Sequence, residues 1–176
     1  MTDAVKKNGI NFGVTLAVIL VLLNIVMYLV DLELFVNSAL GFVRMFIIIT
    51  LAILAVVQAK KALGGFINFK EAFTAFFITI LIGLVAYTLS IIILFNVIDP
   101  QAKATLNEMY LRLALETMQN FTDDTKMLRE VAEQQKGTDN LGIGTQLLGL
   151  AISIVGYSVV GLIVAAILKS KAKTEY

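Results

Sequence analysis

The chain has 176 residues, of which 59% are hydrophobic and 15% charged, and its formal net charge is +1. Its mean hydropathy of +0.88 excludes an ordinary soluble domain, because so few polar residues cannot cover a water-facing surface. The sequence contains no cysteine and no histidine, which excludes disulfides, thiol or imidazole catalysis and His/Cys metal sites within it. The composition indicates an integral membrane protein.

Four apolar runs approach or exceed the roughly 20 residues that a helix needs to cross the hydrocarbon core. The runs are continuous rather than alternating, which excludes transmembrane strands. We therefore expect an all-α fold: a single polytopic membrane domain over residues 1–176, with four transmembrane helices in two hairpins. The expected spans are about 11–30, 39–59, 73–97 and 144–168.

The first run could instead be a cleaved signal peptide, since Lys6 and Lys7 precede it and Val36-Asn37-Ser38 resembles a cleavage site. Its apolar part is longer than a usual signal core, and acidic residues follow it directly. We expect it to remain as a span.

The second run contains Arg44, the one charge well inside an expected span. A charge at such a position is a functional hypothesis by default, although Arg44 lies near the end of its run. We expect its side chain to snorkel outward or to pair with Asp31 or Glu33 in the preceding loop.

Residues 60–77, KKALGGFINFKEAFTAFF, separate the second and third runs. Gly64 can take the left-handed conformation that ends helices. Asn68 is a typical N-cap, with Glu71 in place as its capping-box partner. A turn is the favoured interpretation. The alternative is an anion site for a lipid phosphate or sugar phosphate, made by Lys60, Lys61, Gly64, Gly65 and Lys70.

The segment 99–140 is the one sizeable polar part of the chain. Asp99 before Pro100 predicts a helix start, and a second start is expected at Thr122–Asp124. Two short amphipathic helices cannot bury a core of their own, so their apolar stripes must lie on each other, on the bilayer interface or on a partner. No calcium-loop pattern is present, so a solvated face is favoured over a divalent-ion site; the acidic residues concerned are Glu108, Glu116, Asp123 and Asp124.

The fourth run carries small residues at helical spacing. A seven-residue repeat of glycine keeps one face on a helix–helix seam, where small side chains let backbones approach. Packing within the chain's own four helices is favoured, and a homo-oligomer or another membrane protein is the alternative. The expected packing face consists of Gly142, Gly149, Ser153, Gly156 and Gly161.

The distribution of charge predicts the orientation. Basic residues gather before the first run, between the second and third, and after the fourth, whereas the other side is net acidic. Because lysine and arginine near span ends stay in the cytoplasm, both termini are expected there and segment 99–140 outside. The chain is therefore expected to be a multi-pass protein of the bacterial inner membrane. The lysines concerned are Lys6, Lys7, Lys60, Lys61, Lys70, Lys169, Lys171 and Lys173.

A glycine-rich turn, an Ile-Asp-Pro after the third run and a glycine-studded last run before lysines together resemble a bacterial family, domain of unknown function 4199, common in Bacteroidetes. The resemblance covers essentially the whole chain. It implies the same membrane topology and an association with gene neighbourhoods containing a polyprenol-type glycosyltransferase, and it assigns no catalytic residue. The residues that carry it are Gly64, Gly65, Phe66, Ile67, Phe69, Glu71, Ala72, Phe73, Ile98, Asp99, Pro100, Gly149, Gly156, Gly161 and Lys169.

Three classes of function are open. The favoured one is a non-enzymatic inner-membrane protein, an accessory or scaffold subunit of a membrane complex. The alternative is a lipid-linked carrier or flippase component or a small transporter. Ion- or proton-coupled transport is not indicated, because the expected spans contain neither an acid at mid-membrane nor an internal proline. A pocket between helices lined by Lys60, Lys61, Lys70 or Arg44 would favour the alternative.

An enzyme is disfavoured, because no paired acid and base is present. We expect no cofactor and no metal site. The expected partners are membrane lipids and either a second copy of the chain or another inner-membrane protein, and not nucleic acid.

Overall fold

The computed structural model describes residues 2–120 and 125–170, and within them the protein is helical, with no strand. Four helices are long and apolar enough to cross a membrane: α1, α2, α3 with its η2 extension, and α6. The expected all-α fold with four candidate spans is thus confirmed. The elements are α1 (Asp3–Val30), η1 (Leu32–Phe35, 3-10), α2 (Ser38–Ala62), α3 (Phe69–Ile93), η2 (Leu94–Ile98, π), α4 (Pro100–Gln119), α5 (Thr125–Lys136) and α6 (Ile143–Leu168).

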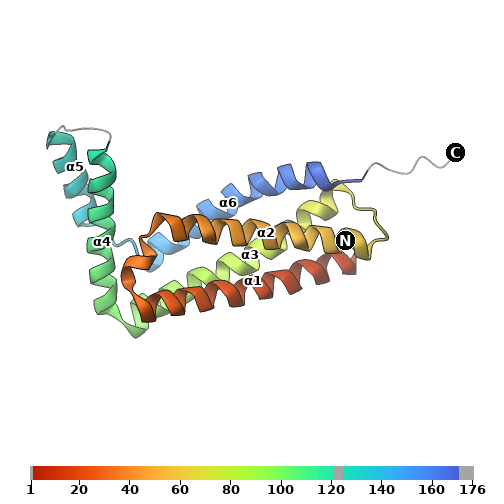
Figure 1. Ribbon diagram of the computed structural model, residues 1–176, viewed down its shortest axis with the longest axis horizontal. Helices are drawn as coiled ribbons and strands as arrows, with labels where there is room; N and C mark the ends of the chain where they lie inside the picture. The colour runs from red at the N-terminus through yellow and green to blue at the C-terminus, as the bar shows by residue number, and fades with distance from the viewer. Residues whose placement is uncertain (1, 121–124, 171–176) are drawn as a thin grey trace.

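The four long helices run side by side, while α4 runs across one end of their bundle with α5 beside it (Figure 1). We call this end the α4 end. The N-terminus, the α2–α3 turn and the last described residues lie together at the opposite end, which we call the terminal end. The expected second helix start at Thr122–Asp124 lies outside the described residues; α5 is described from Thr125.

Helix α3 is the centre of the bundle. It packs against α1, α2 and α6, whereas α6 rests chiefly on α3 and meets α2 at few positions. The main core lies along α3, and its largest fully buried side chains include Phe76, Ile80, Leu16 and Leu20. Since α2 and α6 both contact α3 but hardly each other, space is left between them.

Helices α1 and α3 approach closely through glycines. A Cβ added at Gly9 would lie 3.0 Å from the Cβ of Ile78, and one at Gly13 would lie 2.9 Å from the Cβ of Ile82. Gly83 on α3 is covered in the same way by the side chain of Leu16. Gly9 and Gly13 form a G-x-x-x-G pattern, the usual signal for close helix packing in membranes, which our sequence analysis did not single out.

The α2–α3 turn has the expected local structure. Gly64 and Gly65 have φ of +74° and +88°, which only glycine adopts without strain. Asn68 and Glu71 form the full capping box: the Asn68 side chain accepts from the Glu71 amide at 2.9 Å, and a Glu71 carboxylate oxygen accepts from the Asn68 amide at 3.2 Å. The expected helix end at Gly64 and the expected capping box are confirmed.

The same turn binds the end of α6. The Lys60 ammonium donates to the Leu168 carbonyl at 3.0 Å, and the Ser170 amide donates to the Ile67 carbonyl at 2.8 Å. We call these contacts the terminal clasp. Because Lys60 belongs to α2, the clasp ties α2 to α6 at the terminal end.

At the α4 end, Asp99 caps α4 by accepting from the Gln101 and Ala102 amides, and it also accepts from the Tyr28 hydroxyl at 2.9 Å. The hydrogen bonds from the Ala102 amide and then from the Tyr28 hydroxyl hold the pKa of Asp99 below its usual value, against an opposing effect of burial. Thus α4 begins at a fixed point beside α1.

Candidate functional site

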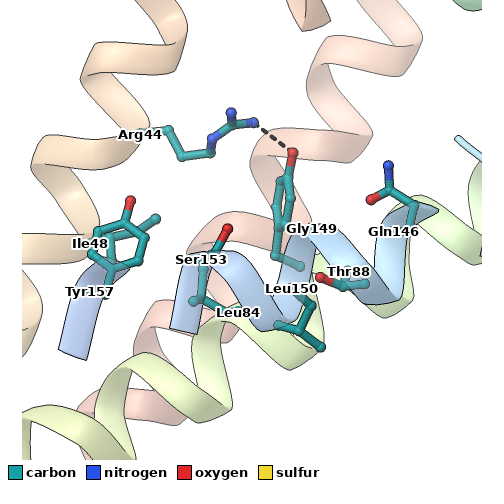
Figure 2. A pocket seen from close by; sticks show the side chains of 10 residues that line it. Arg44, Ile48, Leu84, Thr88, Gln146, Gly149, Leu150, Ser153 and Tyr157 are labelled. Atoms are coloured by element: carbon teal, nitrogen blue, oxygen red, sulfur yellow. Dashed lines mark hydrogen bonds between the residues drawn. The ribbon is translucent and has the colours of Figure 1, made fainter. Parts of the chain in front are cut away.

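A cleft of about 260 Å³ lies between α2, α3 and α6, in the half of the bundle nearer the α4 end. It occupies the space left because α2 and α6 barely meet. Figure 2 shows its lining side chains converging from the three helices. The lining residues are Arg44, Ile48, Leu84, Tyr87, Thr88, Gln146, Gly149, Leu150, Ser153 and Tyr157.

Arg44 supplies the charge of the cleft. Its guanidinium donates a 2.7 Å hydrogen bond to the Tyr87 hydroxyl, with its carbon 4.9 Å from the centre of the Tyr87 ring. Over residues 2–120 and 125–170, no carboxylate forms an ion pair with it. The cleft therefore holds a cation whose described partner is a neutral phenol.

Our expectation for the Arg44 side chain was wrong. We expected an outward-pointing side chain or an ion pair with Asp31 or Glu33, but the side chain enters the cleft instead. Asp31 is occupied as a cap, since its carboxylate accepts from the Glu33 amide at 2.9 Å. Tyr87, on the neighbouring helix, offers an acceptor inside the bundle.

Hydroxyl groups complete the polar lining. Figure 2 shows the Ser153 and Tyr157 hydroxyls directed toward the space that Arg44 overhangs. Within the described part of the chain, Ser153, Tyr157 and Thr88 have no hydrogen-bond partner for these groups. Gln146 is tied back, because its amide donates to the Asn140 carbonyl at 2.9 Å. The cleft is thus lined by one cationic side chain, that of Arg44, and by three hydroxyl groups without a described hydrogen-bond partner.

Helix α4 runs across the end of the bundle nearer this cleft (Figure 1). Tyr110 on α4 and Tyr87 on α3 pack against the same small apolar cluster, which includes Phe95 and Leu106. Burial raises the pKa of Tyr110 to about 12. The apolar stripe of α4 thus serves to cover the bundle end.

A polar network holds α4 in this place. The Lys103 ammonium bridges the Asn96 side-chain oxygen at 2.8 Å and the Asp139 carboxylate at 2.5 Å. Asn107 donates to Asp139 at 3.2 Å and accepts from the Asn140 amide at 3.0 Å. Partial burial raises the pKa of Asp139, but its bonds from Lys103 and Asn107 outweigh this and hold it below the usual value. We call this network the α4 anchor.

The residues of the alternative anion site at the turn lie at the other end of the molecule from the cleft. Lys60 is engaged in the terminal clasp. Lys61, Lys70, Gly64 and Gly65 are exposed, and a Cβ on either glycine would meet nothing within 4 Å. The two glycines therefore serve the turn.

The structure divides the expected packing face of α6. A Cβ on Gly161 would lie 2.7 Å from a ring carbon of Phe76, so this glycine permits close contact with α3. Gly142 precedes α6 and lies against Asp139. Gly149 lines the cleft beside Ser153, while Gly156 is exposed with nothing within 4 Å of an added Cβ. Of the four glycines expected on this face, only Gly161 would bring an added Cβ within 4 Å of another described helix.

The expected divalent-ion alternative gains nothing from the structure. Glu108 and Glu116 are exposed on α4, whereas Asp123 and Asp124 lie outside the described residues. Two of the lysines used to predict the orientation, Lys171 and Lys173, also lie outside them. In the part of the chain that is described, no group of three or more acidic side chains is placed to hold a metal ion.

Sequence reasoning missed Tyr87 and Tyr157 as parts of a site. One signal was present: an arginine inside a span needs a partner at similar depth. Tyr87 lies near the α4 end of its helix, as Arg44 does. A comparison of polar residues at similar depth in the expected spans would therefore have paired the two.

Comparison with known proteins gives one match. A family model described as "Protein of unknown function (DUF4199)" matches residues 11–170. No curated protein and no solved structure matches the chain.

Proposed function

The chain belongs to the DUF4199 family of proteins of unknown function, and we propose that it binds the anionic group of an amphiphile inside the membrane, as a component that carries or presents a lipid-linked molecule. The observation behind this proposal is the cleft lined by Arg44. A pocket of this kind was the feature expected to favour a lipid carrier over a closed scaffold.

The energetic argument starts from the cost of a charge within a membrane-spanning segment. Such a group is costly unless it pairs or reaches water. Tyr87 accepts one hydrogen bond from Arg44 but brings no negative charge. Arginine presents several donors in a planar fork that matches a phosphate or carboxylate. An anion in the cleft would neutralise the guanidinium, and the unpaired hydroxyls of Ser153 and Tyr157 could donate to its remaining oxygens.

We further propose that the protein carries its ligand without transforming it. The cleft lining includes no carboxylate, and the sequence has no histidine or cysteine. General acid–base or nucleophilic catalysis normally requires such a group beside the reacting atoms. The lining groups are donors that bind and orient an anion.

The membrane location is part of the proposal. The lysines at the terminal end favour a multi-pass inner-membrane protein with cytoplasmic termini. With that orientation, the cleft lies in the extracytoplasmic half of the membrane. The ligand would then be held on the side of the membrane that faces away from the cytoplasm.

The test is the lipid that accompanies the purified protein. We expect native mass spectrometry of the full chain in mild detergent to show retained phosphatidylglycerol, and Arg44→Gln to reduce this by about tenfold, as the loss of one charge-assisted contact implies. Arg112→Gln is the matched control, because Arg112 is an exposed arginine on α4 outside the cleft. Equal retention by the wild type and Arg44→Gln would refute the proposal.

A second candidate is the accessory or scaffold subunit favoured by the sequence. The observation in its favour is the exposed side of α6, where Gly156 lies open beside the exposed apolar residues Ile152 and Val159. Such a surface suits a second copy of the chain or another inner-membrane protein. Crosslinking from a cysteine at position 156 distinguishes the two: a protein adduct in native membranes supports the subunit role, whereas adducts with lipid alone contradict it.

A further inference from the structure

We infer that the cleft takes a net-anionic phospholipid from the bilayer, entering sideways between α2 and α6 from the leaflet at the α4 end, and not a soluble anion from water. This inference rests on the proposed function and adds the class of ligand and its route. The inferred route depends on which sides of the cleft other parts of the chain cover.

Helix α4 runs across the α4 end of the bundle and is held in place (Figure 1). Tyr110 on α4 and Tyr87 on α3 pack against the same apolar cluster at this end, and the α4 anchor joins α4 to the end of α3 and to the segment before α6. At its centre, Lys103 contacts both Asn96 and Asp139. A soluble anion approaching along the bundle from this end would have to pass α4, which these bonds hold across its path.

The terminal end is closed by contact between helices. Gly161, Val164 and Ala165 on α6 are buried, and Gly161 lies directly against Phe76 of α3. Beyond them, the terminal clasp joins α2 to α6 through Lys60 and Leu168. The cleft is therefore a recess in one half of the bundle and does not continue through it.

The remaining side is the interval between α2 and α6. Apolar side chains of α6 beside it are exposed, such as Ile152, which adjoins Ser153 and is 65% exposed. In a four-helix membrane protein such surfaces face lipid. Gly156 lies two turns from Gly149 on the same side of α6, and neither glycine places a side chain on the surface beside the cleft, where an added Cβ would meet nothing within 4 Å. A hydrocarbon chain can lie there while the headgroup is in the cleft.

The charge of the lining selects among phospholipids. Arg44 provides a positive charge and no lining residue is acidic. A phosphate would be attracted, but the ammonium group of a zwitterionic headgroup would find no carboxylate. A net-anionic lipid such as phosphatidylglycerol is thus preferred over phosphatidylcholine, and the preference depends on Arg44.

Site-directed fluorescence quenching tests both the ligand and the route. The chain has no cysteine, so a single cysteine at Gly156, where an added side chain meets nothing within 4 Å, can carry a fluorophore beside the cleft. Val18 on α1 is the control position, because it is 53% exposed and lies about as far from the α4 end of its helix as Gly156 does. The full chain is reconstituted in phosphatidylcholine vesicles containing nitroxide-labelled phosphatidylglycerol or nitroxide-labelled phosphatidylcholine.

We expect phosphatidylglycerol to quench position 156 more strongly than phosphatidylcholine does, with equal quenching by both at position 18. Arg44→Gln should weaken the preference by about tenfold, Arg112→Gln should not change it, and an excess of soluble glycerol phosphate should not relieve it. Relief by glycerol phosphate would overturn lateral entry while leaving Arg44-dependent anion binding intact. A preference that Arg44→Gln leaves unchanged would overturn both the inference and the proposed function. The same quenching by both lipids at position 156 would overturn the inference alone, provided that Arg44-dependent retention holds in mass spectrometry.

Discussion

The Arg44 guanidinium on α2 and the Tyr87 hydroxyl on α3 are joined by a 2.7 Å hydrogen bond between two of the helices that are long and apolar enough to cross a membrane. This contact keeps Arg44 turned into the bundle and leaves the rest of its donor fork facing the cleft. It also places Tyr87 at the junction of the two apolar clusters, since Tyr87 packs against both.

A double-mutant cycle measures what this contact contributes. Tyr87→Phe removes the acceptor, and we expect it to lower the free energy of unfolding by about 1 kcal/mol, the usual range for a hydrogen bond between membrane helices. Arg44→Gln should have a similar or smaller effect, because it also removes a half-buried charge from an apolar helix. The combined variant should be less destabilised than the sum of the two. Strict additivity in thermal or denaturant unfolding would contradict the assigned contact.

Replacing a glycine by alanine should destabilise the protein at packed positions and leave its stability unchanged at open ones. Alanine at Gly161 or Gly83 would press on the rings and side chains of Phe76 and Leu16, and we expect each to cost about 1–3 kcal/mol. Alanine at Gly156 should leave the unfolding temperature of the isolated chain unchanged, because its Cβ meets nothing within 4 Å. The measurement is the unfolding temperature of each variant in the same detergent and at the same protein concentration. A large loss for Gly156→Ala in a proven monomer would contradict the position of α6.

Replacing the capping pair tests the α2–α3 turn. Asn68→Ala with Glu71→Ala removes two reciprocal bonds, so we expect a loss of about 1–2 kcal/mol. Lys60→Gln should also destabilise the end of α6, because Lys60 donates to the Leu168 carbonyl, whereas Lys61→Gln should not. Hydrogen exchange of the last α6 amides reads out this difference. Equal exchange in the two lysine variants would show that the terminal clasp does not form.

Orientation can be measured with single cysteines and an impermeant thiol reagent. Gln119 and Lys61 are both exposed and lie at the α4 end and the terminal end respectively. The distribution of lysine predicts that a cysteine at 119 is labelled in intact cells whose outer membrane has been permeabilised, while one at 61 is protected. The reverse pattern would place the cleft in the cytoplasmic half.

The spans and the turn could be predicted from sequence, because each depends on local information. A continuous apolar run specifies a spanning helix, and Gly64, Asn68 and Glu71 specify a helix end and a helix start within a few residues. Family membership was predictable for the same reason, since short motifs spread along the chain carry it.

The packing partners and the site could not be predicted in the same way. Gly9 and Gly156 are equally small in sequence, but one lies against Ile78 and the other is open. The difference depends on the arrangement of the helices, because α3 occupies the centre and α6 lies at its edge. The direction of Arg44 likewise depends on the place of Tyr87 on a neighbouring helix, which no pattern within residues 31–44 contains.

The most direct test of the central claim, that Arg44 and its cleft bind an anionic lipid, is the change in unfolding temperature when phosphatidylglycerol is added to the delipidated full chain. A ligand that binds only the folded state stabilises it in proportion to the logarithm of its concentration over its dissociation constant. We predict a rising unfolding temperature for the wild type and for Arg112→Gln, and little change for Arg44→Gln, with phosphatidylcholine as the lipid control. An equal rise in all three proteins, or none in any, would contradict the claim.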